Sequence, residues 1–284
     1  MNRPQMNAAL RATLVLTLCA SANAMAGGSF APEFDPGDFS APLTIDNPYW
    51  PMPPNTAYVY FTETADGCEW DEVDITNTTR HIDGIDTRVV LDRVWLDESE
   101  SCADQLANYP AGFPYGVLTE TTQDYHAQDD NKNIWYLGEH TIDTTIPPED
   151  CENYVDDGTD SIFPGINGCL DGSFIAGEND ALPGIVMMSD PSKGDFYQQE
   201  FDEDNAEDWG KVLNFVPVED YDTGAEYANC LETKEWSPLE HGAIEHKYYC
   251  PEADGGRGAL VQVKAVSGGP TEWTKLIDVH PIEP

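Results

Sequence analysis

Residues 56–96 read TAYVYFTETADGCEWDEVDITNTTRHIDGIDTRVVLDRVWL, and this stretch decides the fold class. It is rich in β-branched and aromatic residues, which favour strands. The runs that predict strands are residues 57–61, 73–76, 87–91 and 93–96. Asp66-Gly67 and Asp83-Gly84 lie between these runs, and Asp-Gly between such runs is a strong hairpin signal. The stretch therefore predicts consecutive antiparallel strands.

The same pattern continues toward the C-terminus. Further predicted strands are residues 125–127, 134–137, 196–201, 212–216, 243–249 and 259–266. The polar run 129–133 is typical of a hairpin turn in which Asn133 takes a left-handed conformation. Helical periodicity is scarce, with residues 103–108 as the best short candidate. We expect an all-β, mostly antiparallel fold, a meander curled into an open barrel or sandwich with long disulfide-pinned loops.

The first 26 residues have the pattern of a secretory signal peptide. Arg3 and Arg11 precede a short apolar run at residues 14–18, and an A-x-A cleavage site follows, ending at Ala24 or Ala26. The apolar run is shorter than the ~20 residues that span a bilayer. Acylation of Cys19 is the alternative, but Leu18 stands where a lipoprotein signal has a small residue. The sequence predicts a secreted or periplasmic protein with no membrane span.

Three regions are expected along the chain. After the signal peptide, the Pro-rich residues 27–56 predict an extended arm, because proline excludes helix there. Residues 57–284 predict a single β-rich domain. Within it, residues 146–184 are rich in Gly, Pro, Asp and Asn and are too long for an ordinary connection, so we expect a loop excursion.

The cysteine count agrees with export. Of seven cysteines, Cys19 falls in the signal peptide, and six remain for an oxidising compartment. Six cysteines allow 15 pairings, but local spacing suggests Cys68 with Cys102, Cys151 with Cys169 and Cys230 with Cys250. No C-x-x-C pair is present to indicate a structural zinc site.

The chain is strongly acidic. It has 53 acidic and 13 basic residues, a net charge of −40. Because a polyanion is repelled by nucleic acid and by anionic membranes, we expect neither as a partner. The acids either attract divalent cations or keep the protein soluble in a salty medium.

Three segments carry a resemblance. They are IDNPYWP at residues 45–51, YHAQDDNKNIWYLGE at 125–139 and EWSPLEHGAIEHKYY at 235–249. They resemble an uncharacterised group of secreted bacterial β-rich proteins with an N-P-Y-[FW]-P start and a Y-A-Q-D…N-[VI]-W-Y hairpin. His126, inserted beside the hairpin tyrosine, and the added cysteines depart from that pattern. The resemblance implies an exported β-rich domain and no particular activity.

Two histidines suggest a metal site. Alternate residues of a strand share a face, so Asp124 and His126 project together, and His246 lies on one face of a later strand. If these faces meet, the imidazoles and a carboxylate could bind copper or zinc, with Glu139 or Glu235 adding an oxygen. A buried polar network or plain surface histidines explain the same residues equally simply.

Calcium and an apolar ligand are further possibilities. The acidic runs 129–133 and 156–160 contain the oxygen ligands that calcium prefers, but neither has EF-hand spacing, and acidic turns give the same runs. Seven tryptophans and thirteen tyrosines could line a cavity for one small molecule, or form an ordinary core.

Catalysis has little support in the sequence. No G-x-S-x-G motif is present, and with so many acids a carboxylate pair carries little information. The leading hypothesis is a non-enzymatic secreted acidic binding protein that holds a metal ion (copper, zinc or calcium) or a small ligand. His126, His246, Asp124 and Glu139 are the expected site residues. The alternatives are a secreted hydrolase with paired carboxylates and a structural envelope protein without a small ligand.

Overall fold

The computed structural model describes residues 32–98, 101–156, 160–170, 172–221, 223–266 and 271–282. Residues 1–26, to which the signal-peptide prediction applies, lie outside this part. The described chain is dominated by one large, mostly antiparallel sheet that stays open and is not closed into a barrel. This confirms the predicted fold class.

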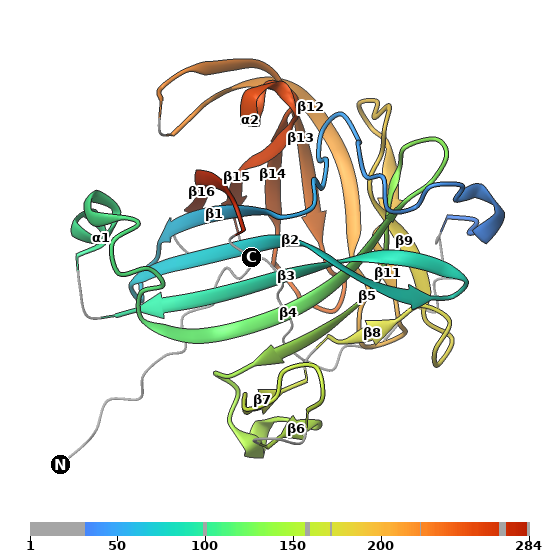
Figure 1. Cartoon of the computed structure of the whole chain (residues 1–284), viewed down its shortest axis with the longest axis horizontal. Helices are drawn as coiled ribbons and strands as arrows, with labels where there is room; N and C mark the ends of the chain where they lie inside the picture. The colour runs from blue at the N-terminus through green and yellow to red at the C-terminus, as the bar shows by residue number, and fades with distance from the viewer. Residues whose placement is uncertain are drawn as a thin grey trace.

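The first half of the sheet is a five-stranded meander, coloured blue to green in Figure 1. Its strands are β1 (Thr56–Glu63), β2 (Cys68–Ile82), β3 (Ile85–Asp97), β4 (Val117–Gln128) and β5 (Ile134–Asp143). The two-residue turn between β2 and β3 is the predicted Asp83-Gly84, and both residues have positive φ, 44° and 86°. Such angles are those of a tight primed turn, which matches the twist of the flanking strands.

Two local predictions in this half are wrong. The runs 87–91 and 93–96 form one continuous strand, β3, because Asp92 between them stays in the ladder opposite Val73 and Thr122. In the β4–β5 turn, Lys132 and not Asn133 takes the left-handed conformation, with φ 67°. Asn133 instead donates from its side chain to Asp129.

The second half of the sheet is another five-stranded meander. Its strands are β12 (Trp209–Glu219), β13 (Glu226–Trp236), β14 (Glu245–Cys250), β15 (Ala259–Ala265) and β16 (Glu272–Pro281). β16 pairs with β1, so the two halves form one continuous sheet, and Figure 1 shows the second half curling back over the first.

Short strands bring the far ends of the sheet together. β9 (Leu182–Met187) pairs with β5 and with β11 (Glu200–Phe201), whereas β10 (Phe196–Gln198) pairs with β12. The predicted strand 196–201 is therefore two strands that pair with opposite ends of the sheet. The excursion after β5 contains β6 (Tyr154–Val155), β7 (Gly168–Cys169) and β8 (Phe174–Ile175).

Helices are few and short. They are α1 (Cys102–Asn108), α2 (Ala253–Gly256) and the 3₁₀ turns η1 (Pro36–Asp38) and η2 (Pro148–Asp150). α1 confirms the helix predicted at 103–108, and its Gln105 accepts a 2.7 Å hydrogen bond from the indole of buried Trp70. In the described ranges, no helix has the length and apolar character needed to cross a membrane.

All three suggested disulfides are confirmed. They join Cys68 to Cys102, Cys151 to Cys169, and Cys230 to Cys250. The first ties α1 to the sheet, the second closes a loop within the 146–184 excursion, and the third joins β13 to β14. Three disulfides are compatible with an oxidising, extracellular or periplasmic compartment.

Apolar packing covers both faces of the sheet. The largest core cluster joins residues of both halves, including Tyr58, Val90, Leu231 and Leu260, and so fills the inside of the curl. Outside β4 and β5, the arm packs on the sheet, where Phe34 and Phe39 contact Trp135 at ring-centroid distances of 5.4 and 5.9 Å.

Candidate functional site

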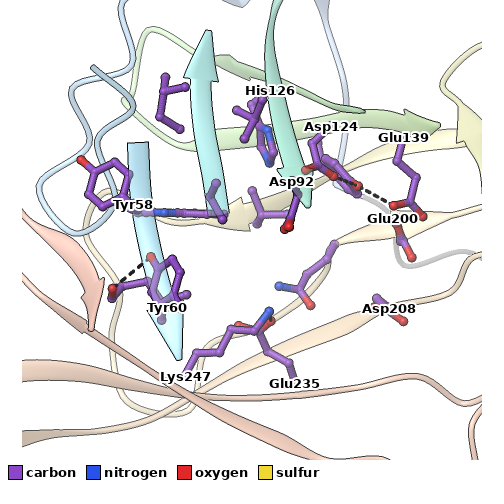
Figure 2. A pocket seen from close by; sticks show the side chains of 18 residues that line it. Tyr58, Tyr60, Asp92, Asp124, His126, Glu139, Glu200, Asp208, Glu235 and Lys247 are labelled. Carbon is purple, nitrogen blue, oxygen red and sulfur yellow. Dashed lines mark hydrogen bonds and ion pairs between the residues drawn. The ribbon is translucent and has the colours of Figure 1, made fainter. Parts of the chain in front are cut away.

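A cavity of about 120 Å³ lies inside the curl, next to the main core cluster. Its lining comes from the arm and from ten strands, which include strands of both halves. Val73, Ile75, Val90, Val186 and Leu260 give the lining its apolar surface. Acids lie among these side chains, since Val73 pairs with Asp92 and Val90 with Asp124 on neighbouring strands. Figure 2 shows the acidic side chains projecting toward a common space. A concave site with an apolar wall and a few polar groups is the usual form of a small-molecule site.

The arm contributes a ring to this cavity through the N-P-Y-W-P motif. Asn47 is fully buried and donates to the backbone carbonyl of Lys132, while its side-chain oxygen accepts from the backbone N–H groups of Tyr49 and Trp50. These bonds fix the turn of the arm. As a result, the indole of Trp50 lies against the rings of His126 and Tyr249, each at a centroid distance of 5.7 Å.

Six carboxyl groups line the cavity. They are Asp92 on β3, Asp124 on β4, Glu139 on β5, Glu200 on β11, Asp208 before β12 and Glu235 on β13. Strand alternation explains this clustering, since Asp92, Asp124 and Glu139 occupy inward positions of three neighbouring strands. Acids from strands far apart in sequence thus share one water-poor space.

Few donors serve these acids. The Tyr136 hydroxyl reaches both Asp124, at 2.5 Å, and Glu139, at 3.1 Å, and Thr141 also donates to Glu139 at 3.1 Å. Burial raises the pKa of Asp124 to about 6 and the pKa of Glu139 well above its usual range. The two carboxyl groups thus share one tyrosine hydroxyl, Glu139 has one further donor in Thr141, and burial favours the protonated form of both acids.

Lys247 is the one lysine or arginine among the lining residues. Its ammonium lies 2.8 Å from Glu235 and 3.9 Å from Glu245, both on its own side of the cavity. These acids raise the pKa of Lys247 against the effect of burial, so it stays charged. Lys247 therefore forms ion pairs with the acids of β13 and β14, and it lowers the pKa of Asp124 and Glu200 only from a distance. No described lysine or arginine forms an ion pair with the cavity acids of β3, β4, β5 and β11.

A second carboxyl pair lies beside the cavity wall. Asp71 and Asp92 are 5% and 4% exposed, occupy diagonal positions on β2 and β3, and lie close enough to share a hydrogen bond once one of them is protonated. No N–H or O–H of another described residue reaches either oxygen of Asp71. Burial raises the pKa of Asp71 to about 7 and that of Asp92 further. The pair is therefore satisfied only while one carboxyl carries a proton for the other.

His126 is the most informative residue of the site. Its side chain is 4% exposed and its ring lies between Trp50 and Tyr136, the latter stacked at 5.0 Å. Burial lowers the pKa of His126 to about 3, so the imidazole is neutral. Its Nδ1 meets no hydrogen-bond partner among the described residues. A buried polar atom without a partner is rare and points to an occupant of the cavity.

The structure brings together three of the four residues expected from the sequence. Asp124, His126 and Glu139 line the cavity, but His246 does not. On β14 it is Lys247 that points inward, so His246 projects from the other face and bonds Glu232 at 3.0 Å. No group of three or more His, Cys, Asp or Glu within the described ranges is arranged to hold a metal ion.

The two acidic runs considered for calcium are turns where the structure describes them. Asp129 accepts from the backbone of Asn131 and Asn133 and from the side chains of Asn133 and Trp135. Asp160 bonds His140 and the backbone N–H groups of residues 162 and 163. The carboxylate oxygens of Asp129 and Asp160 therefore accept hydrogen bonds that stabilise the local backbone. Residues 157–159 of the second run lie outside the description.

Sequence reasoning missed Asp92, Glu200, Asp208 and Lys247. Asp92 carried a usable signal, because an acid interrupts the run VVLDRV at a position that alternation places with Val90 and Val94. Glu200 and Asp208 had none, since they lie at a strand switch and just before a strand. Lysine is rarely buried, so nothing indicated that Lys247 points inward.

Comparison with known proteins adds no further guide to this site. No protein-family model, curated protein or solved structure matches the chain.

Proposed function

We propose that this protein is a non-enzymatic binding protein that works outside the cytoplasm and holds one small organic molecule in the cavity between the two halves of its sheet. The observation that carries this proposal is His126. Its neutral imidazole is buried in the cavity wall and its Nδ1 has no partner among the described residues. A bound molecule supplies that partner.

The size and composition of the cavity support a small ligand. Its volume of about 120 Å³ is close to the ~150 Å³ of a protein cavity that holds one benzene ring. Trp50, Tyr58 and Tyr60 give rigid aromatic contacts, and the carboxyl groups give orientation. A metal ion as sole ligand has less support, because the acids do not form a metal-binding group among the described residues.

The cavity also favours binding over hydrolysis. A glycosidase flanks its scissile bond with two carboxyl groups and holds a sugar on each side. A cavity near the size of one benzene ring does not hold two linked sugar rings. The export part of the proposal rests on the signal-peptide pattern and agrees with the three disulfides.

The test is a fragment screen by ligand-observed NMR, followed by calorimetry on the mature protein. We expect at least one fragment to bind at 1:1 stoichiometry. His126→Ala and the cavity-filling Val186→Phe should each weaken it at least tenfold. His246→Ala, a matched histidine on the other face, should leave it unchanged. The proposal fails if no fragment binds, or if Val186→Phe and His126→Ala have no more effect than His246→Ala.

A further inference from the structure

The charge balance of the cavity identifies the class of ligand, provided that the proposed binding function is right. Six carboxyl groups and one lysine line the space. Fully ionised, they carry a net charge of five negative units, six minus one. A buried charge is tolerated when it is paired, and here the only lysine is already engaged by Glu235. The carboxyl groups of β3, β4, β5 and β11 have no such ion pair among the described residues, and a bound cation would supply one to those that ionise.

The arrangement of the acids that form no ion pair with Lys247 indicates that the cation is compact. Asp92, Asp124 and Glu139 come from adjacent strands, and Figure 2 shows them in a row with Glu200 across from Lys247. Tyr136 lies beside these acids, and its hydroxyl bridges Asp124 and Glu139. A single compact positive group can therefore lie against several acids at once.

The rest of the lining requires an apolar body. Val73, Val90 and Leu260 line the same space, and Val73 and Val90 lie directly beside Asp92 and Asp124 on neighbouring strands. The rings of Trp50, Tyr58 and Tyr60 line the same space, and aromatic faces attract cations within about 6 Å of the ring centroid. A bare metal ion would leave the apolar side chains without contacts, and the carboxyl groups would repel an anion.

We infer that the cavity selects a compact primary amine with a short hydrocarbon body, bound as its ammonium. The ammonium donates its three N–H groups to Asp124, to Glu139 and to the neutral, unpartnered Nδ1 of His126, with Asp92 beside it as a further negative charge. The hydrocarbon lies on the valine and leucine side chains. The ligand thereby supplies a positive charge to the carboxyl groups and a hydrogen-bond donor to His126 Nδ1.

Calorimetry with three probes of one size separates charge from shape. We expect n-butylammonium chloride to bind at 1:1 stoichiometry and at least ten times more tightly than n-butanol, with no detectable binding of butyrate. Glu139→Gln should weaken the ammonium at least tenfold, and Asp124→Asn should do the same. Glutamine has the size of glutamate and can keep the hydrogen bonds of Tyr136 and Thr141, and circular dichroism checks that the variant is folded.

Glu232→Gln is the matched control, because Glu232 lies on the outer face of β13 and should not affect binding. Equal or tighter binding of n-butanol overturns the ammonium inference and leaves the cavity function standing. The inference also fails if Glu139→Gln weakens the amine no more than Glu232→Gln. If none of the three probes binds while another fragment fills the cavity, only the ligand class is wrong. If that screen is empty too, the proposed function fails with it.

Discussion

The two faces of β14 and its neighbours carry opposite charges one residue apart. On the inner face, Lys247 stands among buried acids of β13, β14 and the cavity wall. On the outer face, directly paired positions of four strands form a row of bases: Lys211, Lys234, His246 and Lys264. The outer lysines lie over rings, Lys234 above Trp236 at 4.6 Å and Lys264 above Trp273 at 5.3 Å.

The two arrangements differ in what they cost. Like charges opposite one another on a solvated face destabilise by only a few tenths of a kcal/mol to about 1 kcal/mol. Like charges in a buried space cost far more, and shift pKa values instead of staying ionised. An acidic chain needs no buried acids to be soluble, so the inner cluster is the feature that calls for a functional explanation.

The largest expected effect comes from removing the inner lysine. Lys247→Met leaves Glu235 and Glu245 buried without their cation, which should lower the free energy of unfolding by about 3–5 kcal/mol at neutral pH. Lys234→Met, on the next strand but the outer face, should lower it by no more than about 1 kcal/mol. Urea denaturation of both variants measures this. Equal losses would mean that the two faces do not differ as described.

The next effect is an unusual pH profile. Burial raises the pKa of Asp71 to about 7 and that of Asp124 and Asp208 to about 6. Between the usual carboxyl pKa near 4 and these values, the folded state binds more protons than the unfolded state, so stability falls as pH rises. Asp71 alone accounts for a fall on the order of 3 kcal/mol between pH 4.5 and its pKa of about 7, since one pKa unit corresponds to about 1.4 kcal/mol, and Asp124 and Asp208 add to this fall.

Asp71→Asn tests whether the inner acids cause this fall. Asparagine imitates the protonated carboxyl, so the variant should match the native protein at pH 4.5 and exceed its stability at pH 7.5. Asp86→Asn, at an exposed ion pair with His81, should leave the profile in place. A profile that 0.5 M salt abolishes, and that Asp71→Asn does not change, would instead assign the effect to surface repulsion.

The smallest effect is expected on the outer row. Lys211→Glu places an acid directly opposite Lys234 and should raise the free energy of unfolding by about 0.2–1 kcal/mol. Lys211→Thr, which removes the charge without reversing it, should give a smaller gain. A loss of stability in both variants would show that the row of bases is stabilised by contacts other than those described.

The sequence predicted the first half of the sheet better than the second, and the inner face explains why. β1 to β5 contain β-branched and aromatic runs, and Asp-Gly turns separate the first three of these strands. β13 was missed because its inward residues include Thr233 and Glu235, so the apolar alternation that identifies a strand is broken. β16 was missed for a similar reason, since nearly all of its residues are half-buried.

The candidate site was half predictable. Alternation correctly joined Asp124 and His126, because both lie on one strand. It could not decide which face of β14 turns inward, and the structure turns a lysine toward the cavity and a histidine away from it, against the usual preference. A register shift between Tyr248 and Tyr249 also breaks the alternation beyond that point. Long-range pairing fixes these features, and local sequence does not contain it.

The most direct test of the binding cavity is a crystal structure of the protein soaked with the tightest ligand from the fragment screen. We predict density for the ligand inside the curl of the sheet, between Trp50 and the carboxyl groups of Asp92 and Asp124, with a polar atom within hydrogen-bond distance of His126 Nδ1. Density for the ligand at another surface, with water alone in the cavity, would contradict the account.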